Sequence, residues 1–137
     1  MKMNTKFAVI IALAAIVVTM GAATIAKPEP EQYTNLKVLP KNISSRDLQS
    51  IMTDDFEDGL GVSCGFCHAN AKEGHGLDFA SDAKPEKQIA RAMMRMTLGI
   101  NKKYLKLKHP QLGSAALVVS CTTCHKGQAF PDGTEPK

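Results

Sequence analysis

The sequence is poor in large aromatic side chains, since its 137 residues include no Trp, two Tyr and five Phe. Aromatic residues supply much of the buried apolar surface of a small domain, so this chain needs another source of core. An excess of one charge is also missing, because 17 Lys and Arg face 13 Asp and Glu, for a formal net charge of +4. Nucleic-acid-binding domains carry a strong basic patch, and a balance this even argues against that class of partner.

Cysteine is scarce too, and all four cysteines belong to two short motifs. Residues 64–68, the first motif, and residues 121–125, the second motif, both read Cys-x-x-Cys-His. This is the pattern of covalent haem attachment. Two thiols at this spacing add to the two vinyl groups of one porphyrin, and the adjacent histidine binds the iron from the proximal side. The sequence therefore predicts two haem c groups, with proximal ligands His68 and His125. The attaching thiols are those of Cys64, Cys67, Cys121 and Cys124.

Other uses of paired cysteines fit the sequence less well. The pairs of a zinc ribbon usually lie about 15–20 residues apart, whereas Cys67 and Cys121 are much farther apart. Zinc also requires no histidine directly after each pair. A thioredoxin-type redox pair would need a βαβ pattern around it, and the sequence has none.

Residues 1–26 have the features of a secretory signal peptide. Lys2 and Lys6 precede an apolar run, 7–18, and small residues follow up to Ala26, after which we expect cleavage. The alternative is an uncleaved anchor, because the apolar run and the small residues after it are about long enough to span a bilayer. Covalent haem attachment takes place outside the cytoplasmic membrane, so we expect a periplasmic protein, membrane-anchored if this segment is retained.

The rest of the chain is enough for one small domain. Residues 27–40 contain three prolines and suggest an extended leader, and residues 132–137 form a tail. Between them, residues 41–131 form the expected dihaem domain. Two porphyrins in so short a chain would themselves make up much of its apolar core.

Helical periodicity predicts an all-α fold for this domain. Ser44 begins a capping-box pattern with Asp47, and apolar residues recur at helical spacing up to about Glu57. The first motif follows, and then a loop over residues 69–84. The last short helix should carry the second motif. The expected architecture is two helix–turn–motif units around two covalent haems.

A longer helix is predicted between the two motifs. Pro85 opens it, and it should run to about Leu107, shortly before Pro110. An apolar stripe follows it at positions i, i+4, i+7 and i+11. The stripe consists of Ile89, Met93, Met96 and Ile100.

The ligand on the far side of each iron needs a separate argument. Met52 lies on the first helix ahead of the first motif, where the helix can fold back over the porphyrin, and we expect it to bind the first iron. The second iron has three candidate ligands: Met93, Met96 and His109. His109 stands as far before Cys121 as Met52 stands before Cys64, but a sulfur on a well-formed helix is better placed than a histidine in a turn.

Several stretches resemble the cytochrome c subunit of photosynthetic reaction centres. Residues 89–101 and 119–127 resemble segments of that family, and residues 60–68 are similar to its preceding haem segment. The resemblance covers about residues 39–131. It implies a helix, a turn and a haem motif in each unit, with a helix methionine as sixth ligand.

By matching positions, the resemblance assigns the sixth-ligand role to Met52 and Met93. The family's subunit carries four haems, whereas this chain has two motifs, so the chain looks like one half of that architecture. In the family a histidine beyond the long helix serves a haem that has no counterpart here, and His109 lies near that place. His75, between two glycines, is expected in a solvated loop.

Two irons that each have a histidine and a methionine ligand leave no open position, and thioether ligation raises the reduction potential. We therefore expect an electron carrier between redox partner proteins, rather than an enzyme. The alternative is a dihaem peroxidase-like or other small-molecule redox enzyme with one open or labile iron; a haem-based sensor ranks last. A basic strip near the second motif would suit an acidic partner, although a solvated helix end explains it as well. The strip consists of Lys102, Lys103, Lys106 and Lys108.

Overall fold

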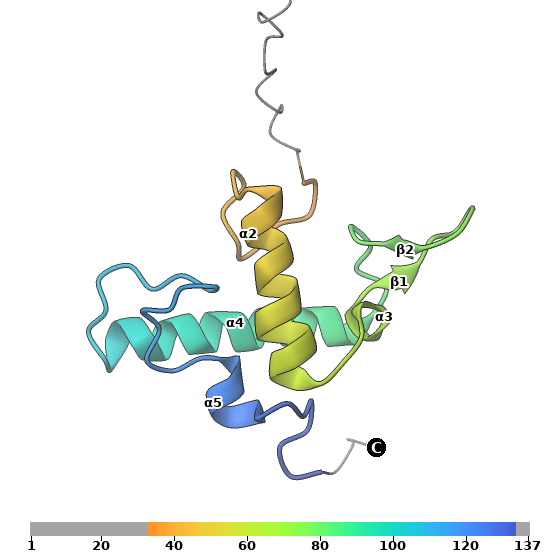
Figure 1. Cartoon of the computed structure of the whole chain (residues 1–137). Coiled ribbons are helices and arrows are strands. Elements are labelled where there is room, and N and C mark those ends of the chain that lie inside the picture. The colour runs from red at the N-terminus through yellow and green to blue at the C-terminus, as the bar shows by residue number, and fades with distance from the viewer. Residues whose placement is uncertain (1–32, 134–137) are drawn as a thin grey trace, which may run out of the picture.

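The computed structural model describes residues 33–133, so the predicted signal peptide at 1–26 lies outside the described residues. Two helical rods dominate the fold in Figure 1. One short helix lies beside an end of the second rod, and another lies near the lower end of the first rod. The elements in chain order are α2 (Ser45–Ser50), η1 (Ile51–Asp58), α3 (Cys64–Cys67), β1 (Ala69–Asn70), β2 (Leu77–Asp78), α4 (Pro85–Lys103) and α5 (Cys121–His125). The rod formed by α2 and η1 crosses α4 (Figure 1).

The first rod begins where the sequence predicts. Ser44 is its N-cap, and the Ser44 hydroxyl accepts a hydrogen bond from the Asp47 backbone N–H at 3.1 Å. After Ser50 the helix widens into the eight-residue π-helix η1, which ends at the C-cap Gly59. π-Helical turns are rare and are frequently found at functional sites. This one carries Met52.

The second rod, α4, ends about one turn earlier than the sequence predicts. Pro85 is in its first turn, as expected, but the helix stops at Lys103 instead of Leu107. The backbone N–H groups of Tyr104 and Leu105 both donate to the Ile100 carbonyl, and Lys106 then adopts a left-handed conformation with φ of 62°. This reversal terminates the helix before the signal at Pro110 is reached.

The buried face of α4 is not the apolar stripe. Five residues of α4 are buried. Four of them are polar, namely Lys87, Arg91, Thr97 and Asn101, and the fifth is Met94. In contrast, Ile89, Met93 and Met96 are exposed, at 56%, 42% and 51%. The buried polar groups are tolerated because they are hydrogen-bonded, and the stripe is left on the outer surface.

Among residues 33–133, the buried apolar side chains are few. Ile51 of η1, Met94 of α4 and Leu112 form a small core cluster where the two rods cross. This agrees with the expectation that side chains alone supply little core. No helix in the described range is both long and apolar enough to span a bilayer.

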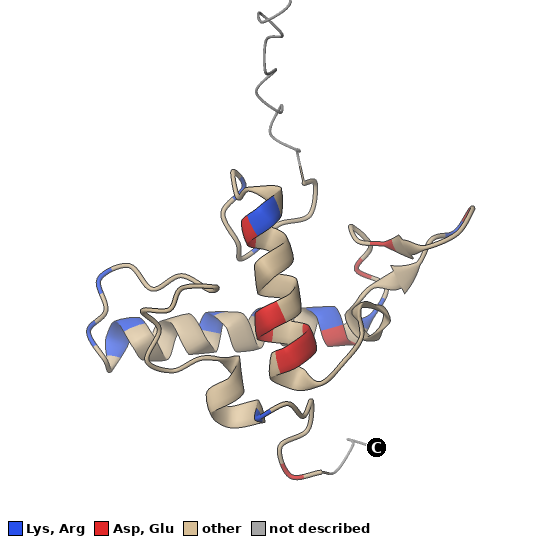
Figure 2. Cartoon of the chain, in the orientation of Figure 1, with Lys and Arg blue, Asp and Glu red and all other residues tan. Residues whose placement is uncertain are grey.

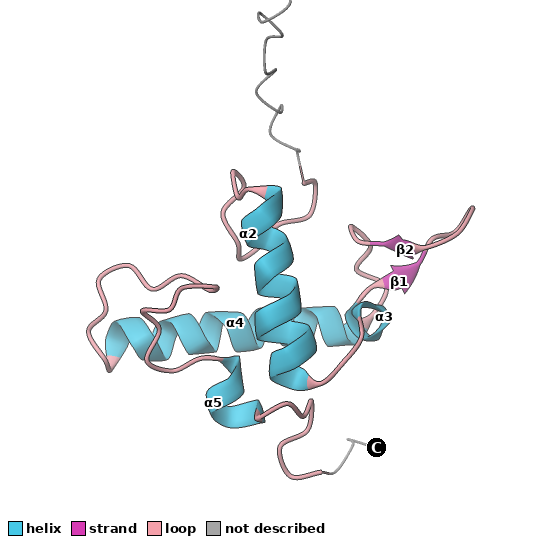
Figure 3. Cartoon of the chain, viewed as in Figure 1, coloured by secondary structure: helices cyan, strands magenta, loops and turns pink. Residues whose placement is uncertain are grey.

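The predicted loop 69–84 contains a small hairpin, which corrects the all-α expectation (Figure 3). Strands β1 and β2 pair antiparallel, with Ala69 opposite Asp78 and Asn70 opposite Leu77. The strand starts directly after the first motif because His68 leaves α3 with extended backbone angles, φ of −104° and ψ of 131°. The fold is therefore helical with one two-stranded hairpin.

The two motif-bearing regions meet at glycines. The Gly127 backbone N–H, just after α5, donates to the Gly59 carbonyl at 3.0 Å. A Cβ at Gly61 would lie 2.2 Å from the Gly127 carbonyl oxygen, and Gly61 also has a φ of 65°. Only glycine allows this close approach. Helix α5 is thereby packed against the end of η1.

Candidate functional site

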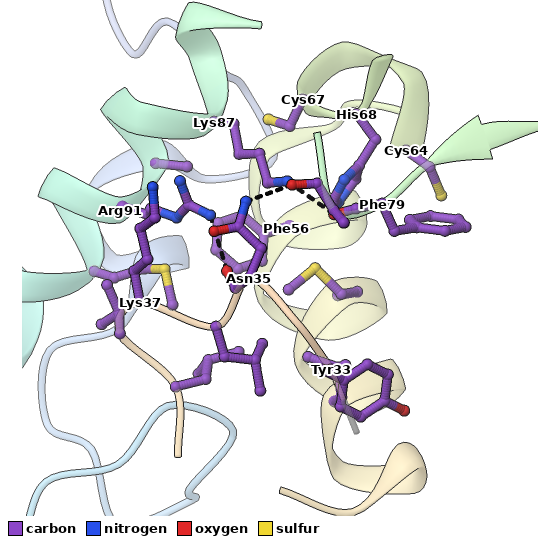
Figure 4. A pocket seen from close by; sticks show the side chains of 18 of the residues that line it. Tyr33, Asn35, Lys37, Phe56, Cys64, Cys67, His68, Phe79, Lys87 and Arg91 are labelled. Atoms are coloured by element: carbon purple, nitrogen blue, oxygen red, sulfur yellow. Dashed lines mark hydrogen bonds between the residues drawn. The ribbon is translucent and has the colours of Figure 1, made fainter. Parts of the chain in front are cut away.

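A cavity of about 410 Å³ lies between η1, α3, α4 and residues 33–39, a stretch that falls within the predicted leader. Met52 and Cys64 line it, together with Cys67 and His68. These are the four residues that the sequence assigns to the first haem. Figure 4 shows that Cys64, Cys67 and His68 lie on one side of the cavity.

His68 is half-buried at the C-cap of α3. Its ring meets the Phe79 ring edge-on, with 5.0 Å between the centroids. The His68 Nδ1 atom is buried and has no hydrogen-bond partner among the described residues. Burial, and then the nearby Lys87 cation, lower the pKa of His68. The neutral imidazole, which is the form that binds a metal, is therefore favoured.

The thiols of the first motif are free and kept protonated. The Cys64 thiol donates to Glu57 Oε1 at 3.1 Å, and this bond raises the pKa of Cys64. Burial raises the pKa of Cys67. Protonated thiols are less reactive toward oxidants and metal ions than thiolates.

Three cationic side chains, Lys37, Lys87 and Arg91, line another part of the cavity, where Figure 4 labels them. Arg91 Nη1 donates to Asp82 Oδ1 at 2.7 Å, and its Nη2 donates to the Asn35 carbonyl at 3.0 Å. Lys37 Nζ lies 2.5 Å from Asp82 Oδ2. Lys87 Nζ donates to two backbone carbonyls, those of Phe79 at 2.8 Å and Ser81 at 2.6 Å. We call Asn35, Lys37, Lys87 and Arg91, which line the cavity, together with Asp82, which pairs with them from outside the lining, the charged wall.

The second motif forms α5, which is capped at both ends. Ser120 makes a capping box with Thr123, and Lys126 closes the helix in a left-handed conformation. His125 Nδ1 lies 3.0 Å from the Gln128 carbonyl and donates to it in the tautomer that leaves Nε2 free for a metal. Burial, and then the charge of Asp55, raise the pKa of Cys121 to about 11.

Asn101 holds the chain that leads into α5. Its side chain is fully buried, and its Nδ2 donates to the carbonyls of Thr97 at 2.9 Å and Val119 at 2.6 Å. Its Oδ1 accepts from the backbone N–H groups of Val118 and Val119. One side chain of α4 therefore fixes the segment directly before the second motif.

The candidate distal ligands for the second motif lie on the outer surface. Met93 and Met96 share the exposed face of α4, and His109 is exposed in the segment after that helix. His75 is exposed in the hairpin turn, as expected. The basic strip lies at the end of α4 and in the loop after it, whereas acidic residues gather on η1 (Figure 2).

Comparison with known families settles which fold family these motifs belong to. The family model described as the photosynthetic reaction centre cytochrome C subunit matches residues 3–135. The chain belongs to this family. Cytochrome c-554 of Chloroflexus aurantiacus is 33% identical over 98 residues, which are 69% of this chain and 21% of that relative. The cytochrome described here thus spans about a fifth of the relative's length. No solved structure matches it.

Membership in this cytochrome family implies covalently bound haem c. The residues of the first motif fit such a group. The cavity is within the size range of cofactor sites, about 300–1,000 Å³. It brings together the two thiols that would attach a haem c with an imidazole and the thioether of Met52, both of which can bind its iron.

Sequence reasoning missed the charged wall of the cytochrome and the position of Met94. Met94 is buried and lines the same cavity as Met52, although it lies off the apolar stripe that the sequence shows on this helix. A signal was present, because Lys87, Arg91 and Met94 follow one another at i, i+4 and i+7. Cations at core spacing on an amphipathic helix indicate a buried polar site.

Proposed function

We propose that this chain is a dihaem c-type cytochrome that carries single electrons between redox partner proteins. The observation that carries the proposal is the gathering of Met52, Cys64, Cys67 and His68 around one cavity. Haem c, when bound, supplies a one-electron change between ferric and ferrous iron. An electron carrier needs an iron to which small molecules cannot bind. This one cavity is lined by two possible iron ligands, His68 and Met52.

At the first motif each residue has a distinct task. Cys64 and Cys67 would hold the porphyrin by thioether bonds, His68 would supply a nitrogen to the iron, and Met52 would supply a sulfur. Phe56, four residues after Met52 on η1, lines the same cavity and would lie against a haem bound there. Exclusion of water and thioether ligation both favour the ferrous state.

At the second motif we assign Cys121 and Cys124 to attachment, His125 to the proximal side and Met93 to the distal side. Support comes from the apolar face that α4 leaves exposed around Met93. Exposed apolar stripes on a helix mark a face that another group covers. Met96 lies on the same face, and it and His109 remain the alternative ligands.

The closeness of the two motif-bearing regions supports electron passage between them. Besides the bond between Gly59 and Gly127, Phe66 of α3 and Phe130 after α5 meet edge-on with centroids 6.5 Å apart. One electron would enter at one haem edge, cross to the other and leave to a second protein. Small, closed redox proteins meet such partners weakly and transiently.

We further propose that the protein is exported to the periplasm. The support is chemical, because haem is attached to cysteines outside the cytoplasmic membrane, and residues 1–26 have the features of a signal peptide. The membrane would be contacted only through that segment, if it is retained.

The test is the ratio of haem to protein in the purified full chain, together with CO binding to the reduced form. We expect two haems per chain and no fast CO binding, because both irons are closed. One haem per chain would overturn the dihaem assignment. Fast CO binding, followed by peroxide turnover, would favour the peroxidase-like enzyme instead.

A further inference from the structure

Residues 33–39, which we call the strap, form one side of the cavity at the first motif. Every residue of the strap lines this cavity, from Tyr33 to Leu39. Val38 and Leu39 are half-buried and pack against the core cluster where the two rods cross. The strap is therefore part of the place where a haem at the first motif would lie.

The backbone of the strap contributes little to holding it there. The strap lies outside every helix and strand of the described chain. Its residues 34–39 share no backbone-to-backbone hydrogen bond with residues 40–133. Segments without such bonds open at a lower cost in free energy than packed helices or strands. Side-chain contacts therefore decide how firmly the strap is closed.

The polar contacts of the strap meet at Asp82, in the loop between β2 and α4. Asp82 accepts hydrogen bonds from Asn35 Nδ2 at 2.8 Å and from Lys37 Nζ at 2.5 Å. It also accepts from Arg91 Nη1 at 2.7 Å, and Arg91 Nη2 donates in turn to the Asn35 carbonyl at 3.0 Å. One carboxylate thus binds two side chains of the strap and orients the guanidinium that binds the strap backbone.

The loop that carries this carboxylate is itself fixed. The backbone N–H groups of Ala80 and Ser81 donate to Asp78 Oδ1 at 3.0 Å and 2.9 Å. Lys87 Nζ, on α4, donates to the carbonyls of Phe79 at 2.8 Å and Ser81 at 2.6 Å. The loop is therefore a firm anchor, to which the strap is attached through side chains.

We propose that the strap closes the cavity of the first motif against small molecules, and that Asp82 is the positioning residue that fastens the strap. This inference rests on the proposed function, in which the first iron is closed. Hydrogen bonds to a charged group are about twice as strong as neutral ones. Loss of the Asp82 charge would therefore loosen Asn35, Lys37 and Arg91 together and open the strap.

The first measurement is trypsin cleavage after Lys37, within the strap, in the full haem-loaded chain. Asp82→Asn keeps the shape of the side chain but removes its charge, and it should speed this cleavage about tenfold, because cleavage follows the population of the open form. Asp82→Glu keeps the carboxylate and should restore most of the protection. Glu73→Gln removes an equal charge from the exposed hairpin turn and should change nothing.

The second measurement is the rate of CO binding to the reduced protein, made in Met52→Ala so that the first iron has a free position. Adding Asp82→Asn should raise this rate about tenfold, because an open strap gives CO access to the cavity. Adding Glu73→Gln should leave the rate unchanged. If Asp82→Asn does not fold, Asn35→Ala leaves the pair of Asp82 and Arg91 intact and should raise both rates about threefold.

Faster cleavage together with faster CO binding supports the inference. Unchanged cleavage, or faster cleavage without faster CO binding, would overturn it while the proposed function stands. Fast CO binding by the unaltered protein would refute the closed iron of the proposed function and the strap with it.

Discussion

The two Cys-x-x-Cys-His motifs share a sequence pattern but lie in different surroundings. The first opens into a cavity bounded by η1, α4 and the charged wall. The second lies on a short helix against the end of η1, where Cys124 is exposed. His125 Nδ1 is held by the Gln128 carbonyl, whereas His68 Nδ1 has no partner among the described residues. The motif would determine where a haem is attached, and the surrounding residues would determine its reduction potential.

We expect the two haems to differ in reduction potential for this reason. Three cations, Lys37, Lys87 and Arg91, and one carboxylate, Glu57, line the first cavity, and cations near an iron favour its ferrous state. Near the second motif, burial and then the carboxylate of Asp55 raise the pKa of Cys121, and this carboxylate would favour the ferric state. The first haem should therefore be the one that is reduced more easily.

The sharpest way to test this difference is to remove each haem in turn. A haem at the first motif would fill the cavity of about 410 Å³ that the side chains leave between η1, α3 and α4. The described part of the chain has few buried apolar side chains to replace it. We expect Cys64→Ala, Cys67→Ala to prevent stable folding, and Cys121→Ala, Cys124→Ala to give a folded protein with one haem. Circular dichroism and the haem ratio measure both, and equal stability of the two variants would contradict the comparison.

The next effect concerns the distal ligand at the first motif. Met52→Ala should remove the weak far-red absorption band of ferric methionine ligation from the first haem and open that iron to CO. Met94→Leu is the matched control, because Met94 lines the same cavity and the change conserves volume. If Met94→Leu removed the band and Met52→Ala did not, the assignment of the ligand would be reversed.

Much of the first site could be predicted from the sequence. The motif fixes Cys64, Cys67 and His68 by chemistry, and helical spacing placed Met52 on the helix that covers the cavity. The N-cap at Ser44 was also predicted correctly, because capping depends on local hydrogen bonds alone.

The features that could not be predicted from the sequence depend on contacts between residues far apart in the chain. The apolar stripe on α4 suggested that Met93 and Met96 face inward, but the buried face carries Arg91 and Asn101 instead. Those two side chains are satisfied by Asp82 and by the backbone near Val119, far along the chain, so no local pattern reveals them. The hairpin was missed for a similar reason, since two-residue strands leave no periodicity to read.

Asn101→Ala should weaken the second region more than the first. Four hydrogen bonds end on this buried amide, and its loss leaves the Val118 and Val119 backbone groups without partners. We expect a loss of about 2–4 kcal/mol in the free energy of unfolding. Denaturant titration measures it, with the exposed Gln111→Ala as control. Retained stability would show that the second motif is held in another way.

The contact between the two regions can be tested at its glycines. Gly61→Ala combines a strained φ with a Cβ placed 2.2 Å from the Gly127 carbonyl oxygen, so the backbones must separate. Gly74→Ala is the matched control, because Gly74 has a φ of 82° and nothing within 4 Å of its added Cβ. Strain alone costs about 1–2 kcal/mol. We expect thermal unfolding to show a loss clearly above that for Gly61→Ala, and a similar loss in both variants would mean that the contact does not matter.

The smallest effect is expected from Asp55, the carboxylate beside the second motif. Burial raises the pKa of Asp55 despite a hydrogen bond from the Gly113 N–H. The folded state therefore binds the proton more tightly than the unfolded state, so ionised Asp55 reduces stability as pH rises from its unfolded pKa through its folded pKa. Asp55→Asn should remove this loss, by less than about 1 kcal/mol because the group is partly solvated. Unfolding between pH 4 and 7 measures it, with the exposed Asp54→Asn as control. A steeper loss of stability with rising pH in Asp55→Asn than in the unaltered protein would contradict this prediction. It would show that the fold stabilises the ionised carboxylate of Asp55 and that its pKa is lowered.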